Sequence, residues 1–127
     1  MSLKTPLGRV LGLGAGGGSH HWWLQRLSSM ALVPLSAWFV IALVRLPDVQ
    51  WATVHGWLAR PLSTVLLLLL VPTLLHHSCV GVRVVVEDYV PNRRAKTLML
   101  LALQFLHFIV GVAAVFAVLK IAFGAAP

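Results

Sequence analysis

Residues 61–82, PLSTVLLLLLVPTLLHHSCVGV, form an uninterrupted stretch without a charged side chain. A helix needs about 20 predominantly apolar residues to cross a hydrocarbon core of roughly 30 Å, and this stretch is long enough. In lipid, only helices and closed barrels satisfy their own backbone hydrogen bonds. The apolar residues are continuous rather than alternating, which favours a helix over a barrel strand. Residues 61–82 therefore predict a transmembrane helix.

Two similar uncharged runs lie on either side of this stretch, at residues 27–44 and 97–119. Hydrophobic residues make up 59% of the chain and charged residues 10%, whereas a soluble domain carries about 25% charged residues. The expected fold class is an all-α membrane protein, with an N-terminal segment (1–25) followed by a three-helix transmembrane anchor (26–127). We expect the three spans at about residues 26–46, 61–86 and 95–123.

Basic residues predict the orientation, because Lys and Arg accumulate in cytoplasmic loops. One side of the predicted spans carries six of them, namely Lys4, Arg9, Arg26, Arg93, Arg94 and Lys96. The other side carries three, namely Arg45, Arg60 and Lys120. We therefore expect a cytoplasmic N-terminus and a C-terminus on the outer, periplasmic side. In the outer loop, Trp51 and Trp57 are typical of the membrane interface and suggest a short helix lying along the outer surface.

Several classes of protein are disfavoured. The net charge is +7, but the basic residues are dispersed and mostly flank the spans, so nucleic-acid binding is not expected. GLGAGG at residues 12–17 has the spacing of a dinucleotide loop, yet no strand pattern precedes it and the first acidic residue is Asp48. Cys79 is the only cysteine, which excludes a disulfide or a four-cysteine metal site within the chain. The first 19 residues lack the apolar core of a secretory signal.

His77 is predicted to lie deep in the bilayer. It precedes Tyr89 by 12 residues, or about 18 Å of helix, so a Tyr89 at the interface puts His77 near mid-membrane. Ionisable residues at this depth are candidates for function. A neutral imidazole can ligate haem iron, and Gly81 on the same helix face can admit a flat macrocycle. The spacing alone favours a hydrogen bond from His77 to a neighbouring helix over a haem ligand, and proton transfer is a third alternative.

Two other histidines lie at comparable depth. His76 is turned about 100° around the helix from its neighbour. His107, in the third span, is more typical of a helix–helix contact than of a ligand.

The polar end of the second span, EDY at residues 87–89, contains a second candidate site. Arg83 and Glu87 are spaced for an i, i+4 ion pair. Tyr89 is either an ordinary interfacial tyrosine or a hydroxyl that holds a carbonyl of a lipophilic ligand, with Asp88 passing protons from the aqueous side. A quinone meets those requirements, because it is apolar, carries two carbonyl acceptors and takes up two protons when reduced.

Together these motifs resemble the small hydrophobic membrane anchor of succinate dehydrogenase, or respiratory complex II. The resemblance covers nearly the whole chain. It rests on HHWWLQRLSSMALVPLSAWF at residues 20–39, on the pattern H-x3-G-x6-D-Y that begins at His77, and on the three-span layout. The first of these segments is most similar to alphaproteobacterial members.

The resemblance implies a multi-subunit complex in the bacterial inner membrane that serves the tricarboxylic acid cycle and the respiratory chain. The small anchor pairs with a second three-helix chain, the cytochrome b anchor. Together they hold an FAD-bearing flavoprotein and an iron–sulfur protein. Electrons from succinate reach ubiquinone through the clusters, and a b-type haem lies between the anchors. The chain alone is expected to have no catalytic turnover.

Residue roles follow from the same resemblance. His77 corresponds to the axial ligand of the haem iron, and Tyr89 to the tyrosine that hydrogen-bonds a quinone carbonyl. Asp88 corresponds to a quinone-site or proton-path residue, and Arg26 to an arginine near the haem propionates, where a guanidinium suits a carboxylate. His20 stands where the family often has a histidine. His76 and His107 receive no role from the resemblance.

Two alternatives remain open at this point. One is a fumarate reductase anchor, which works in the reverse direction with a low-potential quinol. The other is a non-redox membrane protein for assembly or transport, which would use the buried histidines for packing or proton movement. The pair Trp22-Trp23 fits either an interfacial anchor or a contact with the iron–sulfur protein.

Overall fold

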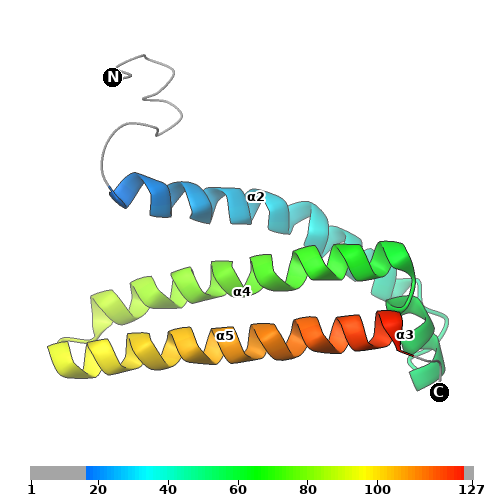
Figure 1. Ribbon diagram of the computed structural model, residues 1–127. Coiled ribbons are helices and arrows are strands. Elements are labelled where there is room, and N and C mark those ends of the chain that lie inside the picture. The colour runs from blue at the N-terminus through cyan, green and yellow to red at the C-terminus, as the bar shows by residue number, and fades with distance from the viewer. Residues whose placement is uncertain (1–16, 125–127) are drawn as a thin grey trace, which may run out of the picture.

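The computed structural model describes the backbone of residues 17–124 and the side chains of residues 22–124. Its helices are α2 (Gly17–Val44), α3 (Trp51–Leu58), α4 (Pro61–Tyr89) and α5 (Arg93–Phe123) (Figure 1). Residues 12–16 of the glycine motif and the side chain of His20 lie outside the described residues.

Three of the described helices are long and apolar enough to cross a membrane, over Trp22–Val44, Pro61–Tyr89 and Arg93–Phe123. The prediction of three spans is confirmed, with shifted ends. The second helix runs three residues beyond the expected end at 86, because its charged last turn keeps its helical hydrogen bonds and the helix stops only before Pro91. The third begins at Arg93, where the Asn92 side chain accepts hydrogen bonds from the backbone N–H groups of Arg94 and Ala95.

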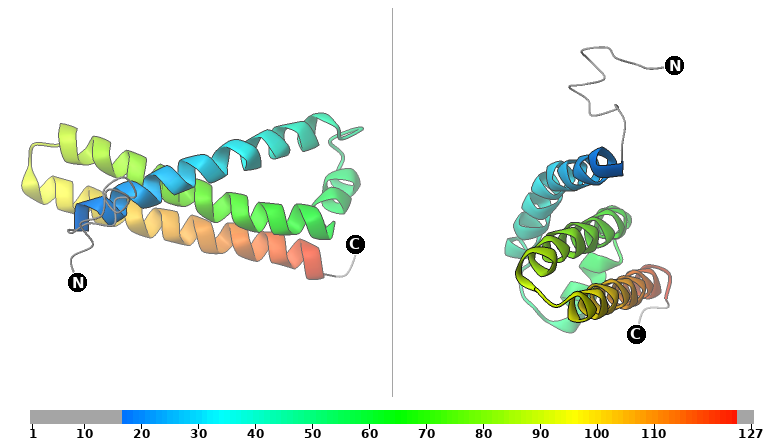
Figure 2. Two further views of the ribbon diagram at one scale, coloured as in Figure 1. Left: turned by 90° about the horizontal axis from the view of Figure 1, so that it is seen from above. Right: turned by 90° about the vertical axis from the view of Figure 1, so that its left-hand side faces the viewer.

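The central element of the bundle is α4, which packs against α2 on one side and against α5 on the other (Figure 2). Seen from above, α2 crosses α4 obliquely, and it diverges from α4 towards its own N-terminal end. The N-terminal end of α2 and the α4–α5 turn lie at one end of the bundle, and α3 lies at the other. The contact between α2 and α4 brings together residues about 50 positions apart, including the candidate ligand His77.

The short helix expected between the first two long helices is confirmed as α3, and one of its two tryptophans is buried against the bundle. Trp57 is buried, with 7% of its surface exposed, and its ring stacks on that of Trp38 at a centroid distance of 6.0 Å. Leu67 and Leu70 of α4 complete this core cluster. Trp51, at the start of α3, is 65% exposed, so its interfacial role stays a prediction.

Truncation of the buried tryptophan should therefore destabilise the fold. We expect Trp57→Ala to lower the free energy of unfolding by about 3–5 kcal/mol, the usual loss for a buried tryptophan. The control is Trp51→Ala, which should change it by less than about 1 kcal/mol because the side chain is exposed. Denaturant titration in detergent micelles, followed by circular dichroism, measures both. Equal losses in the two variants would contradict a core built around α3.

Candidate functional site

His77 lies near the middle of α4 and points towards α2. Its side chain is half-buried, and its Nδ1 atom lies 3.1 Å from the Oγ atom of Ser28. Ser28 is buried, with 7% of its surface exposed. The sequence did not single out this serine, because nothing in the composition of α2 indicates which of its faces meets α4. The contact joins two transmembrane helices through a polar pair, in a region where apolar side chains predominate.

Gly81 follows His77 by one turn and differs from the other glycine in the spans. A Cβ atom added at Gly81 would meet no heavy atom of the described chain within 4 Å outside its own helix. At Gly111, the added Cβ would lie 3.3 Å from Cδ1 of Leu75, so this glycine is the one that permits close packing of α5 on α4. Gly81 therefore does not act as a helix-packing position within this chain. It leaves the helix face beside His77 free of bulk.

His107 behaves as a helix–helix contact, which agrees with the interpretation favoured for it from sequence. Its Nδ1 atom lies 2.9 Å from the Leu103 carbonyl oxygen, one turn earlier in α5. Its Nε2 atom lies 3.3 Å from the Ser78 hydroxyl of α4. A carbonyl only accepts, so Nδ1–H donates to Leu103 and Nε2 accepts from Ser78. Both ring nitrogens are therefore used.

The His76 side chain is exposed. It lines a groove of about 670 Å³ between α4 and α5, together with Cys79, Gln104 and His107. Among the described residues, no group of three or more His, Cys, Asp or Glu side chains is close enough to hold a metal ion. Any metal bound at a histidine of these helices would therefore take its remaining ligands from elsewhere, as a haem iron does from its macrocycle.

Arg26 lies on α2, two residues before Ser28 and hence about 200° around the helix from it. Its guanidinium carbon lies 4.6 Å from the centroid of the Trp22 ring, a cation–π contact. The structure does not bring Arg26 and His77 together. Arg26 instead borders a hollow of about 410 Å³ with Gln25 and Ser29. The side-chain oxygen of Gln25 is buried and has no hydrogen-bond partner among the described residues, which adds it to the candidate site residues.

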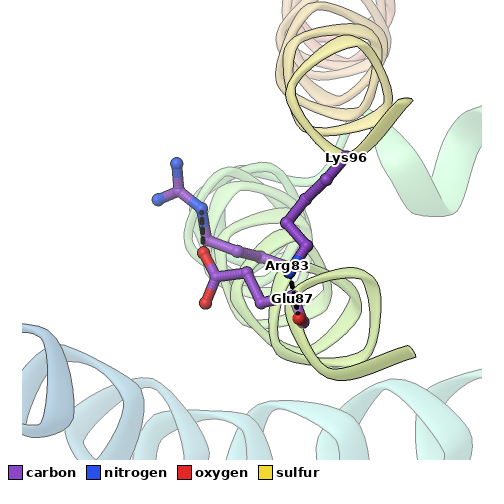
Figure 3. Close-up of polar contacts among 3 residues, drawn as sticks. All are labelled: Arg83, Glu87 and Lys96. Carbon is purple, nitrogen blue, oxygen red and sulfur yellow. Dashed lines mark hydrogen bonds and ion pairs between the residues drawn. The ribbon is translucent and has the colours of Figure 1, made fainter. Parts of the chain in front are cut away.

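Asp88 and Tyr89 form the exposed end of α4, and 82% of the Tyr89 surface is accessible. The preceding turn is held by two polar contacts (Figure 3). The predicted ion pair is confirmed, with Arg83 Nε 3.6 Å from Glu87 Oε1. From α5, the Lys96 ammonium donates a hydrogen bond of 2.7 Å to the Glu87 carbonyl oxygen. These contacts lie beside the helix end that carries Asp88 and Tyr89.

Fold and site together define a small protein with three helices able to span a membrane, a half-buried imidazole near the middle of α4 and an exposed tyrosine at the end of that helix. The chain belongs to the succinate dehydrogenase/fumarate reductase transmembrane subunit family, whose family model matches residues 1–111. The family resemblance proposed from the sequence is confirmed.

Curated relatives place the chain more narrowly, among the membrane anchors of succinate dehydrogenase. It is 32% identical to the succinate dehydrogenase hydrophobic membrane anchor subunit of Rickettsia bellii, over 80% of this chain and 81% of the relative. It is 34% identical to that of Rickettsia felis, over 76% and 80%. It is also 27% identical to that of Paracoccus denitrificans, over 98% and 97%. No solved structure matches the chain.

Proposed function

We propose that this chain is the membrane anchor of a succinate:ubiquinone oxidoreductase, in which His77 ligates the iron of a b-type haem and Tyr89 with Asp88 forms part of the ubiquinone site. The observation that carries the proposal is the half-buried imidazole of His77 beside the unobstructed face at Gly81. Family membership supplies the complex in which such a site would operate.

The residues around His77 fit a haem. One ring nitrogen contacts Ser28, and the other has no hydrogen-bond partner among the described residues, so a lone pair is available for a metal. Gly81 leaves space on that helix face for a planar group. The second axial ligand and the other wall of the pocket would come from the cytochrome b anchor. A bound haem b supplies a one-electron redox centre within the bilayer.

Arg26 would hold a haem propionate, because a guanidinium forms two parallel hydrogen bonds with a carboxylate. Its present partner, the Trp22 ring, is half-exposed and leaves the guanidinium accessible. Arg26 lies about 200° around α2 from Ser28, on the helix side that borders the hollow of Gln25. It would therefore hold the propionate at the edge of the pocket, away from the His77 ring.

At the end of α4, the Tyr89 hydroxyl would donate a hydrogen bond to a ubiquinone carbonyl. The Asp88 carboxylate, exposed at the same helix end, would pass protons from the aqueous phase to the quinone oxygen. Electrons would arrive from the clusters of the iron–sulfur protein, which receives them from the FAD of the flavoprotein. This requires the α4–α5 turn to face the cytoplasm, as the excess of basic residues on that side of the inner membrane indicates.

The relatives are named for succinate dehydrogenase. Their names favour electron flow from succinate to ubiquinone over the reverse, fumarate-reducing direction. An unrelated assembly or transport role would not account for membership of this family.

Purification of the complex through a tag on this chain tests the proposal. We expect a flavin-bearing protein, an iron–sulfur protein and a second anchor to co-purify in equal amounts after extraction in mild detergent. The reduced-minus-oxidised spectrum should show one or more b-type haems. Loss of the flavin and cluster proteins would overturn the assignment to the complex. Their presence without a b-type spectrum would overturn only the haem ligand.

A further inference from the structure

We infer that Ser28 is a positioning residue, which holds the His77 ring in the tautomer that carries hydrogen on Nδ1 and so leaves the Nε2 lone pair free for a metal ion. The inference rests on the proposed function, because a fixed tautomer has a function only if His77 binds a metal. The contact itself is independent of any bound group. It joins α2 to α4 through the Ser28 Oγ atom and the His77 Nδ1 atom, 3.1 Å apart.

The direction of the hydrogen bond follows from the second partner of Ser28. Its Oγ atom lies 2.8 Å from the Gln25 carbonyl oxygen, which can only accept. A serine hydroxyl has one hydrogen, so donation to Gln25 leaves oxygen lone pairs facing His77. The His77 Nδ1 atom must then be the donor. Both distances agree, because O–H···O bonds centre near 2.8 Å and N–H···O bonds extend to about 3.2 Å.

A fixed tautomer matters for a histidine that binds a metal. The ligating nitrogen must be unprotonated, and which nitrogen that is depends on the hydrogen bond that the other one makes. Such a bond also orients the ring and raises the basicity of the ligand. Ser28 is 7% exposed, so water does not readily replace its hydroxyl as the acceptor. The packing of α2 on α4 therefore prepares Nε2 of His77 before any metal arrives.

The two other histidines at comparable depth lack this arrangement. Both nitrogens of His107 are occupied, one by the Leu103 carbonyl and one by the Ser78 hydroxyl. His76 makes no hydrogen bond within the described part of the chain, and its ring is exposed. Only His77 among these three has one nitrogen engaged by a buried acceptor and the other free.

Ser29 provides a matched control. Its hydroxyl donates to the same Gln25 carbonyl oxygen at 2.8 Å and has no contact with His77. Ser28→Ala and Ser29→Ala therefore remove equivalent hydroxyl groups from adjacent positions. Ser28→Thr retains the hydroxyl and should behave as the unmodified chain. A purely structural role in α2 would affect both alanine variants alike.

In the purified complex, Ser28→Ala should weaken haem affinity about 10-fold to 100-fold, the usual effect of losing the hydrogen-bond partner of a metal ligand. The measurement is the haem-to-flavin ratio after dilution or in mild denaturant, which should fall. The haem that remains should have a higher midpoint potential, because a less basic imidazole stabilises ferric iron less. Ser28→Thr should restore both properties. Ser29→Ala should leave the midpoint potential unchanged, because Ser29 does not contact His77. Equal potentials in Ser28→Ala and Ser29→Ala would overturn the inference.

A measurement without haem separates this inference from the proposed function. Nitrogen-15 NMR of histidine-labelled full-length chain in lipid bilayers reports which ring nitrogen carries hydrogen, and His77→Gln identifies the signal. We expect Nδ1–H in the unmodified chain and a shift towards Nε2–H in Ser28→Ala. Nε2–H in the unmodified chain, or the same tautomer in both, would overturn the inference. A complex without haem b would overturn the proposed ligand, while an Nδ1–H signal would still support the role of Ser28.

Discussion

His77→Gln should remove the b-type haem spectrum from the complex, while the flavin and cluster proteins remain attached. Losing a hydrogen-bond partner of a metal ligand already lowers affinity about 10-fold to 100-fold, so losing the ligand itself should lower it at least as much. Glutamine has a side-chain amide that can still hydrogen-bond Ser28, so the contact between α2 and α4 need not be lost with the imidazole. The measurement is the reduced-minus-oxidised absorbance per flavin.

His76→Gln is the control for this experiment, because the two histidines are adjacent in α4 and the His76 ring is exposed without a hydrogen bond to the described chain. The control should keep its haem. Retention of the spectrum in His77→Gln would refute the ligand assignment, and its loss in His76→Gln alone would move the ligand by one residue. A parallel loss in both would indicate that α4 tolerates no amide at this depth.

The transmembrane helices could be predicted from sequence because each depends on a long uncharged run, which leaves few alternatives in lipid. The position of His77 near the middle of the second helix followed in the same way, from its place between Pro61 and Tyr89. The contact of His77 with Ser28 could not be predicted. It depends on which face of α2 meets α4, and helices that are apolar on all sides carry no periodic signal for that choice.

The burial of Trp57 could not be predicted from the sequence for a similar reason. A tryptophan next to a membrane span is common both at the interface and in a core, and only the packing of α3 against the bundle separates the two. Trp38 and Leu67, which bury its ring, come from two different helices. The sequence alone also could not predict the open helix face at Gly81. Gly81 and Gly111 both lie in apolar spans, and only the position of the neighbouring helix distinguishes them. The orientation in the membrane and the roles of His77, Tyr89, Arg26 and Asp88 stay predictions.

Tyr89→Phe should lower succinate-dependent ubiquinone reduction about 10-fold and leave succinate oxidation by a soluble artificial acceptor unchanged. The size follows from the loss of one hydrogen bond of about 1–1.5 kcal/mol. Tyr89 is the only tyrosine in the chain, and 82% of its surface is exposed. Because its hydroxyl has no partner among the described residues, phenylalanine removes a group available to a ligand and disturbs no contact of the described fold.

Comparison of the two assays distinguishes a quinone-site residue from a structural one. Succinate oxidation by a soluble acceptor needs the flavin and cluster proteins but not the quinone site, so only the quinone assay should respond to the missing hydroxyl. Glu87→Gln is the matched control, because Glu87 lies two residues before Tyr89 and the substitution breaks only its exposed ion pair with Arg83. Such pairs contribute little to stability. It should leave both activities unchanged. If Tyr89→Phe lowered both together, the tyrosine would be holding the extrinsic proteins in place, and the quinone carbonyl would need a donor from another chain.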